Sequence, residues 1–156
     1  MTISDREPIQ TLTGSDGVCD PAALAWAFPD VSPGIAPLGA RVLVQLRRIQ
    51  KDMKVGNLKL ILTEEVKENE KWQNTIGRVV ALGPLAFKNR DTMQPWAEGT
   101  WAQVGDYLRV PRWGGDRWER VVPGEDKEEP ALFMILNDHE IIGKVTDDPL
   151  SFKVFI

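Results

Sequence analysis

Cysteine and histidine are almost absent from this sequence, which has one of each among its 156 residues. A zinc site built from Cys and His needs several such ligands, so this kind of metal centre is excluded, and so is a disulfide within the chain. Without an internal disulfide the chain fits a reducing compartment. Phosphate-binding glycine loops and dinucleotide fingerprints are missing as well. We therefore expect no metal and no cofactor in a chain of single-domain length.

Long apolar runs are also missing, including the roughly 18 residues of a membrane-spanning helix and the apolar core of a signal peptide. The sequence thus predicts a soluble, cytoplasmic protein without a membrane partner. The formal net charge of -4 and the pI of about 5.1 argue against a strong nucleic-acid binder.

Residues 112–120 interleave Arg with Trp, a pattern that could stack on single-stranded bases. Asp116 and Glu119 offset much of the positive charge there. A plain hairpin with Trp rings packed on Arg stems is the better interpretation, so no nucleic-acid partner is expected.

Nucleophilic catalysis has little support. His139 is the one histidine that could activate a Ser or Cys19, and none of these nucleophiles lies in a recognisable elbow. The abundant glutamates around Glu64 and Glu68 alternate with lysines, which is typical of a solvated segment. The sequence therefore predicts a protein that is not an enzyme and has no catalytic residue.

The net charge lies in residues 1–34, which we call the arm. The arm contains Arg6 and five acids, whereas acids and bases are equal in number in the rest of the chain. The five acids are Asp5, Glu7, Asp16, Asp20 and Asp30.

A short helix is expected inside the arm. Asp20 can cap its start, Pro21 suits the first helical position, and Pro29 ends it. Two interpretations stay open for the arm: a free tail, or a segment that docks onto a surface through its large apolar residues, which are Leu24, Trp26 and Phe28.

Beyond the arm the pattern changes to short alternating runs separated by turn residues, which predicts an all-β sandwich or small barrel. Two long connections, about 49–74 and 84–103, interrupt the strands and are expected to be functional or mobile. Whether the tryptophans of the chain pack inside or form an interface stays open. The expected strands are 41–47, 76–82, 107–110, 118–122, 131–136 and 140–145.

An apolar cluster, Leu58 to Thr63, lies inside the first charged connection. It can be another strand of the core, which the pattern slightly favours. Alternatively it is an anchor that offers Leu60, Ile61 and Leu62 to the groove of a partner.

Five motifs follow one another over roughly residues 35–146. The motifs are Ile35-Ala36-Pro37-Leu38-Gly39-Ala40-Arg41-Val42-Leu43-Val44, Leu60-Ile61-Leu62-Thr63, Gly77-Arg78-Val79-Val80-Ala81-Leu82-Gly83, Val104-Gly105-Asp106-Tyr107-Leu108-Arg109-Val110 and Asp138-His139-Glu140-Ile141-Ile142-Gly143-Lys144-Val145. In this order they resemble the motifs of the GroES-type co-chaperonins.

The resemblance implies a small GroES-like β-barrel over residues 35–147, with the arm before it and a tail, 148–156, after it. It also implies a heptameric ring that lids a GroEL-type chaperonin during ATP-driven folding. The residues implied to bind the chaperonin are Leu58, Leu60, Ile61, Leu62 and Thr63. Those implied at the subunit interface are Leu38, Val42, Val44, Ile141, Ile142 and Val145.

Departures from the family pattern lie mainly in the added length. Ala40 replaces an Asp, and Asn57 to Lys59 stand where the family has a glycine pair. The arm and the tail look like elaborations of co-chaperonins encoded by viruses of bacteria, which assist folding of a capsid protein in the host cytoplasm. A second hypothesis is a virion structural protein, such as a capsid cement, that uses the same fold and whose arm covers a neighbouring shell protein.

Overall fold

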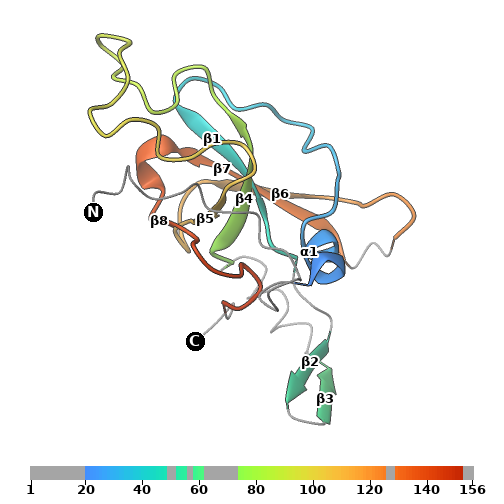
Figure 1. Cartoon of the computed structure of the whole chain (residues 1–156). Coiled ribbons are helices and arrows are strands. Elements are labelled where there is room, and N and C mark those ends of the chain that lie inside the picture. Colours follow the sequence, from blue (N-terminus) through green and yellow to red (C-terminus); the bar gives the residue numbers. More distant parts are fainter. Residues whose placement is uncertain (1–19, 49–51, 56–57, 62–73, 126–128, 153–156) are drawn as a thin grey trace.

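The computed structural model describes residues 20–48, 52–55, 58–61, 74–125 and 129–152 (Figure 1). Its main element is a six-stranded antiparallel sheet in the order β6-β7-β1-β4-β5-β8, which confirms the all-β class. Among the described strands, β6 and β8 are the two edges and do not pair with each other, so the sheet is open. The strands are β1 (Arg41–Leu46), β4 (Ile76–Leu82), β5 (Tyr107–Arg109), β6 (Asp116–Arg120), β7 (Ala131–Asn137) and β8 (Gly143–Lys144).

Strand β1 lies inside the sheet, and its nearly continuous apolar run suits burial on both faces. It pairs with β7 along one edge and with β4 along the other. Val42, Val44 and Leu46 enter one hydrophobic cluster, as their period of two predicts, and Leu43 enters a second cluster. The strand therefore joins two cores, one on each face of the sheet.

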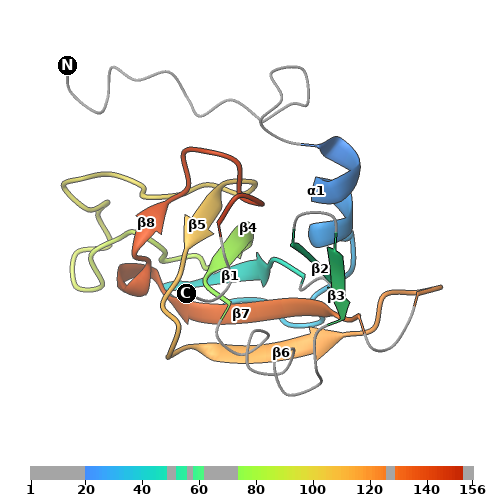
Figure 2. The ribbon, with the colours of Figure 1, turned by 90° about the horizontal axis from the view of Figure 1, so that it is seen from below.

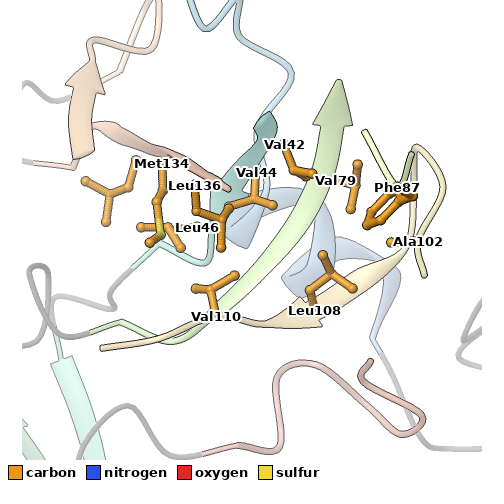
Figure 3. Close-up of a cluster of buried hydrophobic side chains, with 11 residues drawn as sticks. Val42, Val44, Leu46, Val79, Phe87, Ala102, Leu108, Val110, Met134 and Leu136 are labelled. Atoms are coloured by element: carbon orange, nitrogen blue, oxygen red, sulfur yellow. The ribbon is translucent and has the colours of Figure 1, made fainter. Parts of the chain in front are cut away.

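The first core gathers aliphatic residues from β1, β4, β5 and β7 (Figure 3). Phe87 and Ala102 close it from the connection between β4 and β5. The half-buried rings of Trp96 and Trp101 pack against it. Its remaining buried members are Val42, Val44, Leu46, Val79, Leu108, Val110, Leu132, Met134 and Leu136.

The second core lies on the other face and is partly covered by the arm. Val31 packs against the cluster formed by Leu43, Val122, Ala131 and Phe133. The extended chain from residue 29 to residue 40 runs from the helix back to the start of β1 (Figure 1). The described part of the arm therefore acts as a cover for this sheet.

Helix α1 (Pro21–Ala27) has the caps expected from the sequence. Asp20 accepts a hydrogen bond from the backbone N–H of Ala22 at 3.1 Å, and Pro21 stands at the first helical position. The N–H of Phe28 donates to the carbonyl of Leu24 at 3.0 Å and ends the helix.

The docking interpretation of the arm holds for these described residues. Phe28 is buried, with its ring centroid 5.3 Å from that of Tyr107. Two sheet side chains bind carbonyls of the segment that follows the helix: Gln45 Nε2 donates to Pro29 at 2.7 Å and Trp118 Nε1 to Pro33 at 2.8 Å.

Strand β6 starts and ends two residues earlier than the predicted run 118–122. Gly114 and Gly115 have positive φ values of 106° and 68°, and they turn the chain before Asp116. A Cβ at Gly115 would lie 2.7 Å from the backbone oxygen of Ile135, so the close approach to β7 also requires glycine.

The predicted strand over 140–145 is wrong for most of its length. Asp138–Glu140 form a 3-10 helix, η3, and only Gly143–Lys144 form β8. The buried Asp138 carboxylate accepts the N–H of His139 at 2.8 Å and that of Phe87 at 2.9 Å. These two bonds bend the chain where the sequence pattern indicated an extended strand.

The connection from Pro84 to Gln103 folds back onto the first core. The Phe87 ring centroid lies 5.5 Å from that of Trp96 and 6.3 Å from that of Trp101, and the two Trp centroids are 4.8 Å apart. Phe87 is 2% exposed. For Trp96 and Trp101, the structure therefore answers the question of packing: both pack within the chain.

Candidate partner-binding site

The candidate anchor lies on a hairpin that is separate from the main sheet. Strands β2 (Asp52–Val55) and β3 (Leu58–Ile61) pair with each other in a two-stranded sheet (Figure 1). A strand thus forms at Leu58–Ile61, but it is not a strand of the six-stranded core sheet as the pattern had slightly favoured. Leu62 and Thr63, the other two candidate residues, lie outside the described residues.

The register of this hairpin groups apolar residues. Met53 stands opposite Leu60, and Val55 stands opposite Leu58. Residues that are directly opposite in an antiparallel pair share a face, and positions two apart along a strand share it too. The four apolar positions therefore lie on one face of the hairpin.

Sequence reasoning missed β2. A usable signal was present, because Gly56-Asn57 separates two short runs, Asp52-Met53-Lys54-Val55 and Leu58-Lys59-Leu60-Ile61. Two residues of this kind between alternating runs are typical of a tight β-hairpin. Met53 and Val55 therefore join the candidate residues.

The two ends of the segment that carries the hairpin meet at the main sheet. Arg48 is the last described residue before residues 49–51, and Asn74 is the first after residues 62–73. Asn74 Nδ2 donates to the carbonyl of Arg47, and the N–H of Arg47 donates to Ile76 at 2.9 Å. We call Arg47, Arg48, Asn74 and Arg117 the loop base.

Arg48 is the most connected residue of the loop base. Its Nε donates to the carbonyl of Trp26 at 2.8 Å, and its Nη1 donates to Glu125 Oε2 at 2.6 Å and to the carbonyl of Glu129 at 2.9 Å. Its guanidinium carbon lies 4.5 Å from the centroid of the Trp26 ring, a cation–π contact. The backbone N–H of Arg48 also donates to Ala27 at 2.9 Å.

The other two arginines of the loop base bind backbone carbonyls. Arg47 Nη1 donates to Pro149 at 2.7 Å. Arg117 Nη1 donates to Asn74 at 2.9 Å, and its Nη2 donates to Pro111 at 2.9 Å. Burial lowers the pKa of the Arg117 guanidinium below its ordinary value. This arginine is committed to internal contacts.

The Arg-Trp stretch of residues 112–120 is largely occupied within the chain. The Trp118 ring stacks on Phe133 with centroids 5.9 Å apart, while Trp113 is 71% exposed. Stacking of alternate rings on bases would require both tryptophans to be free. Trp118 thus packs within the chain, but on Phe133 and not on an arginine stem as predicted, and its strand β6 pairs with β7.

The candidate subunit-interface residues fall into two groups. Val42 and Val44 are fully buried inside this chain, and the strand that carries them is paired on both edges. These two residues are therefore not available to another subunit, and their assignment is corrected. Leu38 and Ile142 are exposed, Ile141 packs partly against the first core, and Val145 is buried.

Among the described residues, no metal-binding arrangement forms around the one histidine. The His139 side chain is 69% exposed, and its Nδ1 lies 3.5 Å from Oδ1 of Asp138. That Oδ1 also accepts the backbone N–H of His139, and Oδ2 accepts the N–H of Phe87. Across residues 20–48, 74–125 and 129–152, no three His, Cys, Asp or Glu side chains gather at a possible metal site. Within that same part of the chain, no helix has the length and apolarity needed to cross a bilayer.

Comparison with known proteins gives no further assignment. No family model matches the sequence, and no curated protein matches it either. The resemblance to the GroES-type co-chaperonins therefore rests on the five sequence motifs alone.

Proposed function

We propose that this chain is a co-chaperonin that lids a GroEL-type chaperonin and thereby assists ATP-driven protein folding. One observation carries the proposal: the Leu58–Ile61 strand belongs to a hairpin that pairs with no strand of the main sheet. An apolar strand in that position is suited to contact a groove on another protein. The proposal requires neither a catalytic residue nor a cofactor in this chain.

The energetics favour several weak contacts that act together. Burying Leu60, Ile61 and Leu62 contributes about 1.5–3 kcal/mol for each side chain. Ordering a segment on binding costs about 2–5 kcal/mol. One copy therefore binds weakly. Several copies on one ring bind tightly through effective concentration and still release when the chaperonin changes state.

The proposed assembly is a ring, with seven copies as the family implies and each sheet closed into the GroES-type barrel. Leu38 and Ile142 support it as contact residues, because they are large apolar side chains exposed by 70% and 61%. In the open sheet β6 and β8 are the edge strands, and barrel closure in the proposed ring would bring these two strands together.

The host and client complete the proposal. The added arm and tail favour a form encoded by a virus of bacteria that acts in the host cytoplasm, with the major capsid protein as a client. The capsid-cement alternative depends on an arm that covers a neighbouring protein. Val31 and Phe28 instead pack on the chain's own sheet, so the described part of the arm does not favour that alternative.

The test is a pull-down of the full chain with a GroEL-type chaperonin, with and without ATP. We expect nucleotide-dependent capture that the double substitution Leu60→Asp with Leu62→Asp abolishes, since charged side chains cannot enter an apolar groove without a large desolvation cost.

The matched control is Val104→Asp with Val121→Asp. These residues are 63% and 54% exposed and lie outside the hairpin, so this variant should bind like the parent chain. Equal capture of both double variants would contradict the assigned binding residues, and no capture of the parent chain would contradict the function.

A further inference from the structure

The described part of the arm contacts several strands of the main sheet. The ring centroid of Phe28 lies 5.3 Å from that of Tyr107 on β5 and 5.6 Å from the guanidinium carbon of Arg78 on β4. Further along the arm, side chains of β1 and β6 donate to its carbonyls. The sheet residues that make these contacts, which we call the arm-binding face, are Gln45, Arg78, Tyr107 and Trp118.

The two hydrogen-bond donors of the arm-binding face are held in position by the sheet itself. Oε1 of Gln45 accepts Nη2 of Arg78 at 3.0 Å, while Nε2 of the same Gln45 donates to the arm at 2.7 Å. Gln45 is only 2% exposed. The Trp118 ring stacks on Phe133, and its Nε1 donates to the arm at 2.8 Å. Donors of fixed orientation suit recognition of an extended segment through its backbone.

The part of the arm that occupies this face is short and has little conformational freedom. It comprises residues 28–33, which we call the docking segment. The carbonyls bound by Gln45 and Trp118 belong to Pro29 and Pro33. Because proline fixes φ, the segment has fewer conformations to lose when it docks.

A linker of six residues, 35–40, joins the docking segment to β1. Gly34, with a φ of 78°, precedes this linker and gives the chain a hinge point. Two large apolar side chains of the linker are exposed, Ile35 by 48% and Leu38 by 70%. When extended, six residues span about 20 Å. Leu38 is also a proposed contact residue between copies, so the linker lies at the proposed boundary between two subunits.

We propose that the arm-binding face takes the docking segment of a neighbouring copy, so that copies of this chain are linked by exchanged arms. Each contact that the segment makes within one chain can also be made between two chains, which is why exchange of identical elements is a low-cost route to assembly. That the copies stand side by side rests on the proposed ring. The ability of the face to bind the segment of a second chain does not.

The experiment places the segment and the face on different chains. In a reporter chain, Gln45→Glu with Trp118→Phe removes both donors. Glu has the shape of Gln, and Phe keeps an aromatic ring against Phe133. A spin label at the exposed Ser32→Cys, in a chain that also carries Cys19→Ser, follows the docking segment. We expect a slow label in the parent chain and a fast label in the reporter chain alone.

An unlabelled acceptor chain then supplies an intact face. Phe28→Ala with Val31→Asp releases its own docking segment, since Phe28 is 3% exposed and Val31 packs against the second core. Excess acceptor chain is expected to make the reporter label slow. The matched control is an acceptor chain that also carries Gln45→Glu and Trp118→Phe, and it should leave the label fast.

Sedimentation of the unlabelled parent chain tests exchange in the assembly itself. The acceptor chain cannot offer its docking segment to a neighbour. We therefore expect its copies to separate at a concentration about tenfold higher than those of the parent chain. Equal sedimentation of the two chains over the whole concentration range overturns the proposal.

Three outcomes of the label experiment also overturn it: a label that stays fast with the acceptor chain, a label that becomes slow with the control, or a slow label in the reporter chain alone. Circular dichroism in the near ultraviolet verifies folding. Where a double variant does not fold, Trp118→Phe alone replaces the reporter changes and Val31→Asp alone the acceptor changes, with the same outcomes. Exchange by a chain that no chaperonin captures supports this interface and removes the proposed function, whereas capture without exchange does the reverse.

Discussion

The two long connections of this chain have opposite structural roles. Residues 84–103 fold back on the first core through Phe87, whereas residues 52–61 contribute a hairpin that pairs with itself (Figure 2). Both interrupt the strands in a similar way in the sequence. The comparison teaches that length does not decide the role of a connection: aromatic rings attach residues 84–103 to the first core, whereas the described strands β2 and β3 pair with each other.

Aromatic residues explain why residues 84–103 pack on the first core. Phe87, Trp96 and Trp101 contact one another, and each large ring removes a large apolar area from water. The hairpin segment instead alternates apolar residues with charged ones, as in Met53-Lys54-Val55 and Leu58-Lys59-Leu60. That alternation gives one apolar face, which suits a partner better than an enclosed core.

The largest effect is expected from Phe87→Ala. The substitution deletes a ring that is 2% exposed, and it should lower the free energy of unfolding by about 3–5 kcal/mol. Chemical denaturation of the full chain measures the change. Trp113→Ala is the control, since that ring is 71% exposed and its loss should change stability little. Equal losses from both variants would mean that residues 84–103 are no better packed than an exposed loop.

A smaller effect is expected from Asp138→Ala. The carboxylate holds the N–H of Phe87 at 2.9 Å, where φ is +61°, an uncommon value for a residue other than glycine. Leaving this buried N–H without its acceptor should lower the free energy of unfolding by about 1–3 kcal/mol.

Asp91→Ala, at an exposed position of the same connection, is the matched control. Thermal unfolding compares the two variants. If both substitutions have the same small effect, the bond from Asp138 to Phe87 is not what holds the connection in place.

The smallest effect on stability is expected from Leu60→Asp with Leu62→Asp. Because β3 pairs only with β2 among the described strands, the six-stranded sheet should keep its free energy of unfolding within about 0.5 kcal/mol. Denaturation by urea measures it. A loss comparable to that of Phe87→Ala would show that these leucines belong to the core after all, and the contrast between the connections would disappear.

Most of the regular structure could be predicted from local signals. Asp20, Pro21 and Pro29 set the bounds of α1, and the alternation of Val42, Val44 and Leu46 predicted both the strand and the face that it buries. Strand β7 follows equally clearly from a continuous apolar run, and β4 from an apolar run that Gly83-Pro84 closes. In these elements the local pattern and the tertiary environment agree.

The remaining features depend on contacts between distant residues. The start of the last predicted strand is instead part of the 3-10 helix that begins at Asp138, whose carboxylate accepts from Phe87, 51 positions away. Val42 and Val44 were predicted at the interface because the resemblance implies that the first strand pairs with the last strand of a neighbouring subunit, yet β4 and β7 pair with both edges of β1 here. Pairing with a strand so distant in the sequence leaves no local signal.

The candidate site could be predicted only in part, because some of its contacts also join residues that are far apart in the sequence. The apolar run Leu58–Ile61 was visible in the sequence, and its partner β2 could have been found from Gly56-Asn57. The loop base could not be found, because Arg48 and Glu125 meet across 77 positions and each looks like an ordinary surface charge.

The central place of β1 has a consequence for how the chain is made. Arg41 pairs with Asn137, so about 100 further residues must be synthesised before β1 can be flanked on both sides, which takes several seconds at about 5–20 residues per second. Until then β4 and β5 can associate with β1, while Leu43 lacks the Phe133 that covers it in the finished sheet. We therefore expect the nascent chain to expose an aggregation-prone half-sheet, and β7 to complete both cores in one late step.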